Sequence, residues 1–257
     1  MQATNFNLQD YFKRIGYSGN PGNNTETLKS IMRCQLFSVP FENLDVQAGK
    51  VVSMVPEEIV EKLVYRQRGG YCYEVNGLFA MALQALGFEY QLVAARPMFY
   101  PVRRPKTHMA IVVQSEQQAW LCDLGFGSYG IRAPMALQLL DQEVTQDNDC
   151  FKLSANGPGT FLLQAKVEQH WQQQFEFDLN PWEFLDFYPA NYMNSTHPDA
   201  IFVQKLLVVL HTPSGRHILL GNTLKTITNG VVEKRFLSAE QCTATLKTVF
   251  GLTVDQG

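Results

Sequence analysis

A cysteine in this sequence stands where a nucleophilic thiol could operate. Cys72 follows Gly69 and Gly70 and opens a strongly periodic apolar segment. A thiol in the first turn of a helix faces free N–H groups and the positive end of the helix dipole, which favour the thiolate. A single cysteine is more often a small buried hydrophobic residue, so Cys72 alone does not establish a nucleophile.

A nucleophilic cysteine needs a base, and the base needs an orienting acceptor. His108 and Asp123 suit these roles, because segments 107–113 and 119–124 resemble the arms of a hairpin around Ser115-Glu116. If position 114 pairs with 117, His108 lies directly opposite Asp123. Opposed Cβ atoms in a sheet are roughly 4.5–5.5 Å apart, which suits a hydrogen bond from imidazole to carboxylate. A one-residue slip would separate the two faces.

Each member of this set also has an ordinary structural role. His108 could be a satisfied structural histidine, and Asp123 could simply lead into the following Leu-Gly-Phe-Gly turn. Cys122 would point to the opposite side of its strand and is predicted to be a core residue. Cys72, His108 and Asp123 together form a papain-like arrangement that is assembled from distant segments, and this favours covalent catalysis.

The composition narrows the function classes. The chain has 257 residues, 46% of them apolar and 18% charged, with a net charge of -3. This balance does not favour nucleic-acid binding, and no apolar run approaches the roughly 20 residues that span a bilayer. The start lacks a signal-peptide pattern, so we expect a cytoplasmic protein. Five scattered cysteines without a C-x-x-C pair indicate reduced thiols and no metal site.

The pattern along the chain changes from helical to extended. Apolar spacing predicts helices over 8–15, from a cap at Thr25, from Pro56 to 64, and over 75–86, with Ser238 capping a last one. Strands are predicted over 109–113, 119–124, 161–167 and 202–210, with a turn at 212–215. The order is therefore a helical bundle, a β-rich middle, and a mixed β-hairpin and helix.

Four motifs in this sequence resemble those of the arylamine N-acetyltransferase family. They occur in the family order over roughly the first 130 residues, and Asn191-Tyr-x-Asn-Ser195 and Thr212-Pro-Ser-Gly-Arg216 match more loosely. The four are Val39-Pro-Phe-Glu42-Asn43-Leu-Asp45, Arg68-Gly-Gly-Tyr-Cys72-Tyr-Glu74-x-Asn76-Gly77, Thr107-His108-Met-Ala and Asp123-Leu-Gly-Phe-Gly127.

This resemblance implies an α+β protein in three parts. It places a helical bundle over 1–88, a β-barrel over 89–200 and an α/β lid over 201–257. It also implies that Cys72, His108 and Asp123 are a catalytic triad. The expected reaction is ping-pong transfer of an acetyl group from acetyl-CoA, through a Cys72 thioester, to an arylamine or arylhydrazine. No bound cofactor or metal is expected.

The resemblance also suggests residues for substrate binding. The loop 125–130, with Phe126, Gly127 and Ser128, resembles the family loop that meets CoA phosphate, and Thr107 precedes the triad histidine. Its G-x-G-x-x-G string does not indicate a dinucleotide fold, because the residues after it are a poor helix start. Phe37, Phe126 and Phe202 are candidates to line an aromatic acceptor pocket, although core packing is the commoner role of any phenylalanine.

Further basic and acidic residues surround these motifs. Arg68 and Glu42 are expected to form a buried pair that supports the cysteine loop. Arg103, Arg104 and Lys106 could attract CoA phosphates or form a solvated basic loop.

Two positions depart from the family pattern. Gln35 stands where a histidine is common, and Val75 replaces the usual glutamine between Glu74 and Asn76. Neither belongs to the triad, so activity is expected to survive, with some change in pocket shape or helix contacts.

Other functions remain open at this point. The nearest is a macrolactam-forming amide synthase that uses the same three residues on the same scaffold. A papain-like peptidase or transglutaminase fits the local motifs less well. A catalytically silent binding protein is a fourth alternative, and an ordinary, slowly reacting Cys72 would favour it.

Overall fold

The first two helices form where the apolar spacing predicts them. Helix α1 (Leu8–Ile15) ends at Gly16, whose φ of 67° is left-handed. Helix α2 (Thr25–Ser38) is capped by Asn24 and not by Thr25, so the predicted cap is wrong by one residue. The Asn24 side chain accepts from the N–H of Thr27 at 2.8 Å, while the Thr25 hydroxyl bonds Ser115 Oγ at 3.0 Å.

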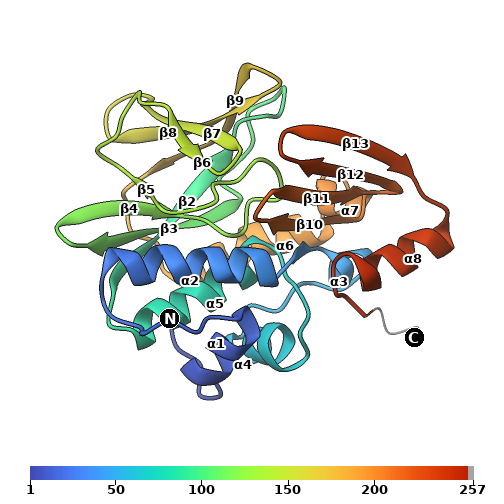
Figure 1. Ribbon diagram of the computed structural model, residues 1–257, viewed down its shortest axis with the longest axis horizontal. Coiled ribbons are helices and arrows are strands. Elements are labelled where there is room, and N and C mark those ends of the chain that lie inside the picture. The colour runs from blue at the N-terminus through green and yellow to red at the C-terminus, as the bar shows by residue number, and fades with distance from the viewer. Residues whose placement is uncertain (254–257) are drawn as a thin grey trace.

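A computed structural model describes residues 1–253, in which two β-sheets are flanked by helices (Figure 1). The part predicted to run over 201–257 therefore has four residues outside the described ones. The remaining helices are α3 (Leu44–Gln47), α4 (Pro56–Val60), a π-helical turn (Glu61–Tyr65), α5 (Cys72–Ala85), a 3₁₀ turn (Phe184–Phe187), α6 (Tyr188–Thr196), α7 (Ile201–Gln204) and α8 (Ala239–Thr248).

Helix α5 is the central element of the helical part. Its first twelve residues, from Cys72 to Leu83, are all buried, as expected for a helix that is apolar on all sides. It begins at Cys72, as the sequence predicts, and packs against β3. The nucleophile candidate therefore lies at the junction of the helices with the first sheet.

The first sheet contains eight antiparallel strands in the order β5-β4-β3-β2-β9-β8-β7-β6. Within residues 1–253 its edge strands β5 and β6 do not pair with each other, so the predicted barrel is an open, curled sheet. Edge strand β5 has only two residues and follows Pro134, which has no N–H to donate. The strands are β2 (Glu89–Pro97), β3 (His108–Ser115), β4 (Gln118–Cys122), β5 (Met135–Ala136), β6 (Val144–Gln146), β7 (Asp149–Ala155), β8 (Thr160–Val167) and β9 (His170–Asp178).

The hairpin of β3 and β4 differs from the predicted register by two residues. Ser115 pairs with Gln118, and the turn consists of Glu116 and Gln117, with φ of 51° and 65°. Two positive φ values define a turn whose twist matches the flanking strands. With the turn at these two residues, each residue of β3 pairs with a residue of β4 two positions later in the chain than predicted. Ile111 therefore faces Cys122, and His108 is not directly opposite Asp123. An offset of two keeps the side chains on the same face.

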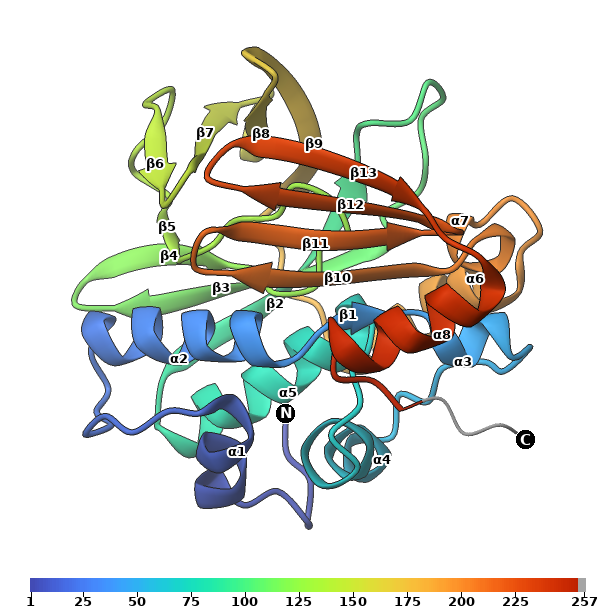
Figure 2. The same cartoon turned by 45° about the vertical axis from the view of Figure 1, so that its right-hand side comes forward.

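The second sheet has the order β1-β10-β11-β12-β13 (Figure 2). The short β1 comes from the N-terminal third of the chain and pairs with β10. Helix α8 covers one face through an apolar cluster with Val208, Leu219 and Leu246, and Ser238 caps it as predicted. The strands are β1 (Phe41–Glu42), β10 (Leu207–Thr212), β11 (Gly215–Leu220), β12 (Thr223–Thr228) and β13 (Val231–Phe236).

The predicted strand 202–210 is half wrong. Phe202 lies in α7, and β10 begins only at Leu207. The side chain of Asn43 explains the boundary, because its Nδ2 donates to the carbonyls of Phe202 and Lys205 at 2.7 and 2.8 Å. Its Oδ1 accepts from the N–H of Leu207 at 2.7 Å. A distant side chain thus satisfies the backbone before the strand.

The described residues contain neither a candidate membrane-spanning helix nor a candidate metal site. Among the helices that the structure describes, none combines the length and apolar character that a membrane crossing requires. Over residues 1–253, no three His, Cys, Asp or Glu side chains are grouped so that they could hold a metal ion.

Candidate active site

Cys72 is buried in the first turn of α5 and borders a cavity. The residue is 3% exposed. Glu74 caps the start of the helix, because its Oε2 accepts from the N–H of Tyr71 at 3.0 Å. Burial raises the pKa of the Cys72 thiol, and the Asp123 carboxylate adds to this. Backbone N–H groups of Met109 and Tyr73 act in the opposite direction by donating to the sulfur.

His108 and Asp123 are joined by a hydrogen bond in spite of the shifted register. His108 Nε2 and Asp123 Oδ2 are 2.8 Å apart, and both residues are buried. Because Nε2 faces the carboxylate, Nδ1 is the ring nitrogen that remains for a reacting group. The imidazole packs against the rings of Phe126 and Phe175, at centroid distances of 5.1 and 5.2 Å. The hydrogen bond and the two rings together fix the orientation of the imidazole.

Asn76 completes the surroundings of Asp123, although its place in the sequence motif predicts no role for it. Its Nδ2 donates to Asp123 Oδ1 at 3.0 Å and to the carbonyl of Met109 at 2.7 Å. The N–H of Gly125 also donates to Asp123 Oδ1, at 2.9 Å. Asn76 lies four residues after Cys72, on the same face of α5. The four-residue spacing from Cys72 is the feature of the sequence that indicates a position for Asn76 near the site.

The cavity beside Cys72 has a volume of about 340 Å³, at the small end for ligand pockets. Cys72 and His108 both line it, and so do five residues expected to bind substrate: Thr107, Phe126, Gly127, Ser128 and Phe202. The wall is largely apolar, with Ile218 and Leu220 of β11 among the lining residues and Arg104 and Asp199 as its charged ones.

Phe37 is the exception among the expected residues, because it does not line this cavity. Two guanidinium groups lie close to its ring, with Arg33 Cζ at 4.9 Å and Arg132 Cζ at 5.5 Å from the ring centroid. The ring faces cationic side chains, which the aromatic face attracts. It is a structural residue in the packing of α2.

The three basic side chains of the loop before His108 differ in their surroundings: two form ion pairs, and one lines the cavity. Arg103 pairs with Glu176 at 2.6 Å, and Lys106 pairs with Asp178 at 2.5 Å. Arg104 lies over the Tyr100 ring at 4.8 Å and lines the cavity. Of these three, only Arg104 is placed to meet a ligand there.

Two glycines let the loop after Asp123 approach the nucleophile. A Cβ on Gly125 would lie 2.6 Å from Cys72 Cα, and a Cβ on Gly127 would lie 2.9 Å from the Phe41 ring. Both distances are too short for any side chain. The loop is therefore pressed between the start of α5 and the second sheet.

The expected pair of Arg68 and Glu42 is present and belongs to a larger charged cluster below Cys72. Arg68 donates from two nitrogens to Glu42 Oε1, at 2.7 and 3.1 Å. Lys62, from the π-helical turn, bonds Asp45 at 2.6 Å and Glu74 at 2.7 Å. Burial raises the pKa of Glu74 to about 7, against the opposing effect of Lys62.

Removal of Lys62 is expected to destabilise the protein in a pH-dependent way. In Lys62→Met the buried carboxylates of Glu42 and Glu74 lose a cation, which costs about 3–5 kcal/mol for a broken buried pair. The folded-state pKa of Glu74 then rises further above its unfolded value, so stability falls as pH rises. Urea unfolding should therefore show a larger loss relative to wild type at pH 8 than at pH 5. An equal loss at both pH values would contradict this account.

The two departures from the family pattern contact each other. Gln35 is buried and accepts from the Tyr11 hydroxyl at 2.8 Å, while its Nε2 donates to the carbonyl of Val75 at 2.8 Å. Gln35 therefore anchors α2 to the first turn of α5. Neither residue touches the cavity.

Comparisons with known proteins identify the family of this chain. A family model described as N-acetyltransferase matches residues 24–257. An arylamine N-acetyltransferase of Escherichia coli is 34% identical over 253 residues, which cover 96% of this chain and 89% of the relative. An arylamine N-acetyltransferase / N-hydroxyarylamine O-acetyltransferase of Salmonella typhimurium is 32% identical and covers 84% and 76%.

Solved structures show the same fold along almost the whole chain. The arylamine N-acetyltransferase from Salmonella typhimurium aligns with a TM-score of 0.91 at 28% identity, covering 100% of this chain and 95% of its own. The Mycobacterium marinum arylamine N-acetyltransferase in complex with CoA aligns with a TM-score of 0.90 at 30% identity, covering 95% and 92%. The chain therefore belongs to the arylamine N-acetyltransferase family.

Proposed function

We propose that this acetyltransferase moves an acetyl group from acetyl-CoA to an arylamine or arylhydrazine through a thioester on Cys72. One observation carries the proposal: Cys72 and His108 line the same cavity, and Asp123 holds His108 by a 2.8 Å hydrogen bond. This is the nucleophile, base and orienting group that covalent acyl transfer requires. The relative solved with CoA supports the choice of donor.

The first half-reaction begins with an ion pair. Burial raises the pKa of an isolated Cys72 thiol, so the thiolate needs a proton acceptor beside it. His108 Nδ1 takes the proton, and the Asp123 carboxylate stabilises the imidazolium through Nε2. Thiolate and imidazolium then attract each other in a water-poor site, which offsets the cost of burying the sulfur charge.

Acetylation exchanges one thioester for another. Cys72 Sγ attacks the carbonyl carbon of acetyl-CoA, and the proposed oxyanion donors are backbone N–H groups at Cys72. The bond from that carbon to the CoA sulfur breaks, and His108 returns its proton to the leaving CoA thiolate. Because the exchange is nearly thermoneutral, orientation and charge stabilisation supply most of the catalysis.

The second half-reaction uses the same residues in reverse. The amine attacks the Cys72 thioester, His108 accepts the amine proton, and the carbon–sulfur bond breaks to release the amide and restore the ion pair. Phe126 and Phe202, whose side chains line the cavity, are the proposed contacts of the aromatic acceptor. Gly127 and Ser128, with Thr107 nearby, are the proposed contacts of the donor, through backbone N–H groups that hold phosphate.

The size of the cavity helps to distinguish arylamine acetylation from macrolactam formation. A volume of about 340 Å³ suits one aromatic ring and the end of a donor arm better than a long carrier-bound polyketide. This supports a small amine over macrolactam formation. The five free cysteines are compatible with a reducing compartment such as the cytoplasm.

Steady-state kinetics test the proposed reaction. Initial rates measured against acetyl-CoA at several fixed concentrations of an arylamine should give parallel double-reciprocal lines, with the acetylated amine and free CoA formed in equal amounts. Intersecting lines would indicate a ternary complex and overturn the covalent route. Absence of an acetylated product, with a slowly reacting Cys72 thiol, would favour a silent binding protein.

A further inference from the structure

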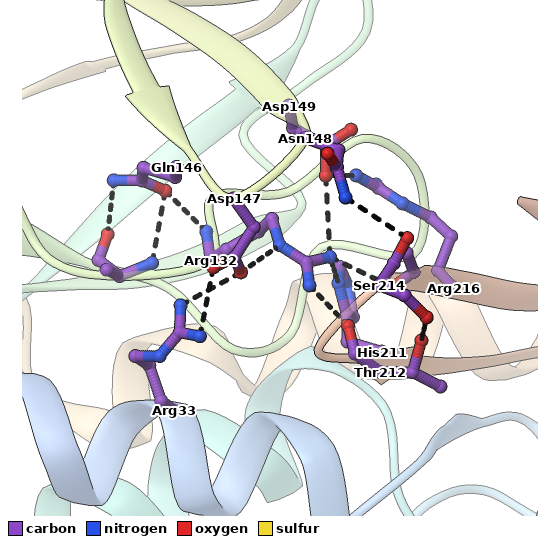
Figure 3. Close-up of polar contacts among 12 residues, drawn as sticks. Arg33, Arg132, Gln146, Asp147, Asn148, Asp149, His211, Thr212, Ser214 and Arg216 are labelled. Carbon is purple, nitrogen blue, oxygen red and sulfur yellow. Dashed lines mark hydrogen bonds and ion pairs between the residues drawn. The ribbon is translucent and has the colours of Figure 1, made fainter. Parts of the chain in front are cut away.

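A cluster of arginine and aspartate side chains lies next to the cavity loop and includes two fully buried arginines. We call it the arginine junction and define it as Arg33, Arg132, Arg216, Asp147 and Asp149 (Figure 3). It joins four separate parts of the fold: helix α2, the segment around Arg132 that follows the cavity loop, the β6–β7 turn and the β10–β11 turn. Arg132 and Arg216 are both completely buried. Fully buried arginines are rare and need many partners.

Arg132 connects the segment after the cavity loop to both sheets. Its Nε donates to Asp147 Oδ2 at 2.8 Å in the β6–β7 turn. Its terminal nitrogens donate to the carbonyls of Gly215, at 2.9 Å, and Thr212 in the β10–β11 turn. Burial and the two arginines hold the pKa of His211 well below its usual range. The neutral His211 ring can therefore accept from Arg132 through Nδ1 at 3.3 Å.

Arg216 holds the cavity loop itself. One terminal nitrogen donates to the carbonyl of Ser128 at 3.3 Å, and the other donates to Asp149. Its guanidinium lies over the Tyr129 ring at 5.0 Å, and Lys225 donates to the Tyr129 hydroxyl at 2.7 Å. The residue after Ser128 is thus fixed by a stacked cation as well as by hydrogen bonds.

The start of the loop is fixed by close packing. Gly125 approaches Cys72, and Gly127 approaches Phe41 so closely that neither position has room for a Cβ. Because Arg216 binds Ser128 and stacks on Tyr129, the loop is held at its start and at its end and has little freedom to shift. The face that remains open is the one that lines the cavity, through Gly127 and Ser128.

We propose that Arg216 is a positioning residue for the acyl donor: it sets the 125–130 loop so that the backbone of Gly127 and Ser128 fits acetyl-CoA. This rests on the proposed function, because it assigns the loop to the donor half-reaction. Arg216 touches no reacting atom. It acts through Ser128 and Tyr129, and Arg132 supports it by sharing Asp149.

Lysine cannot take over this role. The planar guanidinium donates to Ser128 and Asp149 and stacks on Tyr129 with the same group, whereas an ammonium is a compact point charge without that fork. Arg216→Lys therefore keeps the charge but releases the loop. A shift of the loop by a fraction of an ångström misplaces a donor that depends on its N–H groups. A small donor without a nucleotide does not depend on them.

The test compares two acetyl donors in single-turnover acetylation of Cys72. Acetyl-CoA is one, and p-nitrophenyl acetate, a small activated ester, is the other. In Arg216→Lys we expect the concentration of acetyl-CoA for half-maximal acetylation to rise about tenfold, with the p-nitrophenyl acetate rate within about twofold of wild type. Arg33→Gln is the matched control. It removes an ion pair from Asp147 without touching the loop, and both donors should react as in wild type.

Each outcome has a distinct meaning. An equal loss with both donors, or no loss with acetyl-CoA, would overturn the role of Arg216. Failure of the wild-type protein to react with acetyl-CoA, while it reacts with the ester, would instead overturn the proposed donor. If Arg216→Lys does not fold, Asp149→Asn weakens the anchor of Arg216 and leaves its side chain in place. It should show the same donor-selective defect to a smaller extent, and a variant that treats both donors alike would contradict the proposal.

Discussion

Serine in place of Cys72 lowers kcat/KM for acetyl transfer by about 10⁴-fold or more, the scale on which loss of a catalytic nucleophile is felt. The hydroxyl is nearly isosteric with the thiol, so the fold and the cavity should persist. It does not ionise near neutral pH, and His108 would have to remove its proton during attack. The measurement is the rate of acetylarylamine formation with saturating acetyl-CoA.

Cys122 provides the control for this substitution. It is fully buried, precedes Asp123 directly and has a thiol pKa raised by burial, but it does not line the cavity. Cys122→Ala should keep kcat/KM near the wild-type value and should cost only stability, by loss of packing. Equal losses in the two variants would show that damage to the core, and not loss of a nucleophile, explains the Cys72 result.

Asparagine in place of Asp123 is expected to lower kcat/KM by about 10³–10⁴-fold. In the native site the Asp123 carboxylate accepts from His108, Asn76 and the N–H of Gly125. An amide can offer one acceptor oxygen only, and its NH₂ group must face one of these donors or bind the wrong imidazole tautomer. The imidazolium also loses its stabilising charge. Both effects leave Cys72 without its base.

The pH profile of Cys72 alkylation distinguishes a catalytic effect from a loss of structure. In Asp123→Asn, iodoacetamide should react slowly up to a higher pH than in wild type, because the ion pair no longer forms. Asp186→Asn makes the same chemical change at an exposed carboxylate that accepts from the N–H of Glu183 at 2.9 Å. That control should keep both the wild-type profile and the wild-type rate. An unchanged profile in Asp123→Asn would remove Asp123 from the mechanism.

Local features of the site could be predicted from the sequence because they depend on neighbouring residues. The start of α5 at Cys72 follows from two glycines and a long apolar repeat, and Gly16 and Ser238 mark helix ends by their own conformational preferences. The association of His108 with Asp123 was expected on a hairpin. It survives in the structure because an error of two residues preserves the face of a strand.

Features that depend on distant contacts could not be predicted in the same way. The turn at Glu116 and Gln117 requires positive φ at residues that carry no strong signal for it. Phe202 joins a helix because Asn43, far away in the chain, binds the backbone around it. The burial of Arg132 depends on partners from the β6–β7 and β10–β11 turns. No spacing rule brings such segments together.

The most direct test of the account is the intact mass of the protein after brief exposure to acetyl-CoA without an amine. We expect one adduct of about 42 Da, the mass that an acetyl group adds to the nucleophile. It should be absent in Cys72→Ala and should disappear when an arylamine is added. If acetyl-CoA leaves no adduct while iodoacetamide still labels Cys72 rapidly, the thiol is activated but acetyl-CoA is not its donor. That result would contradict the central claim.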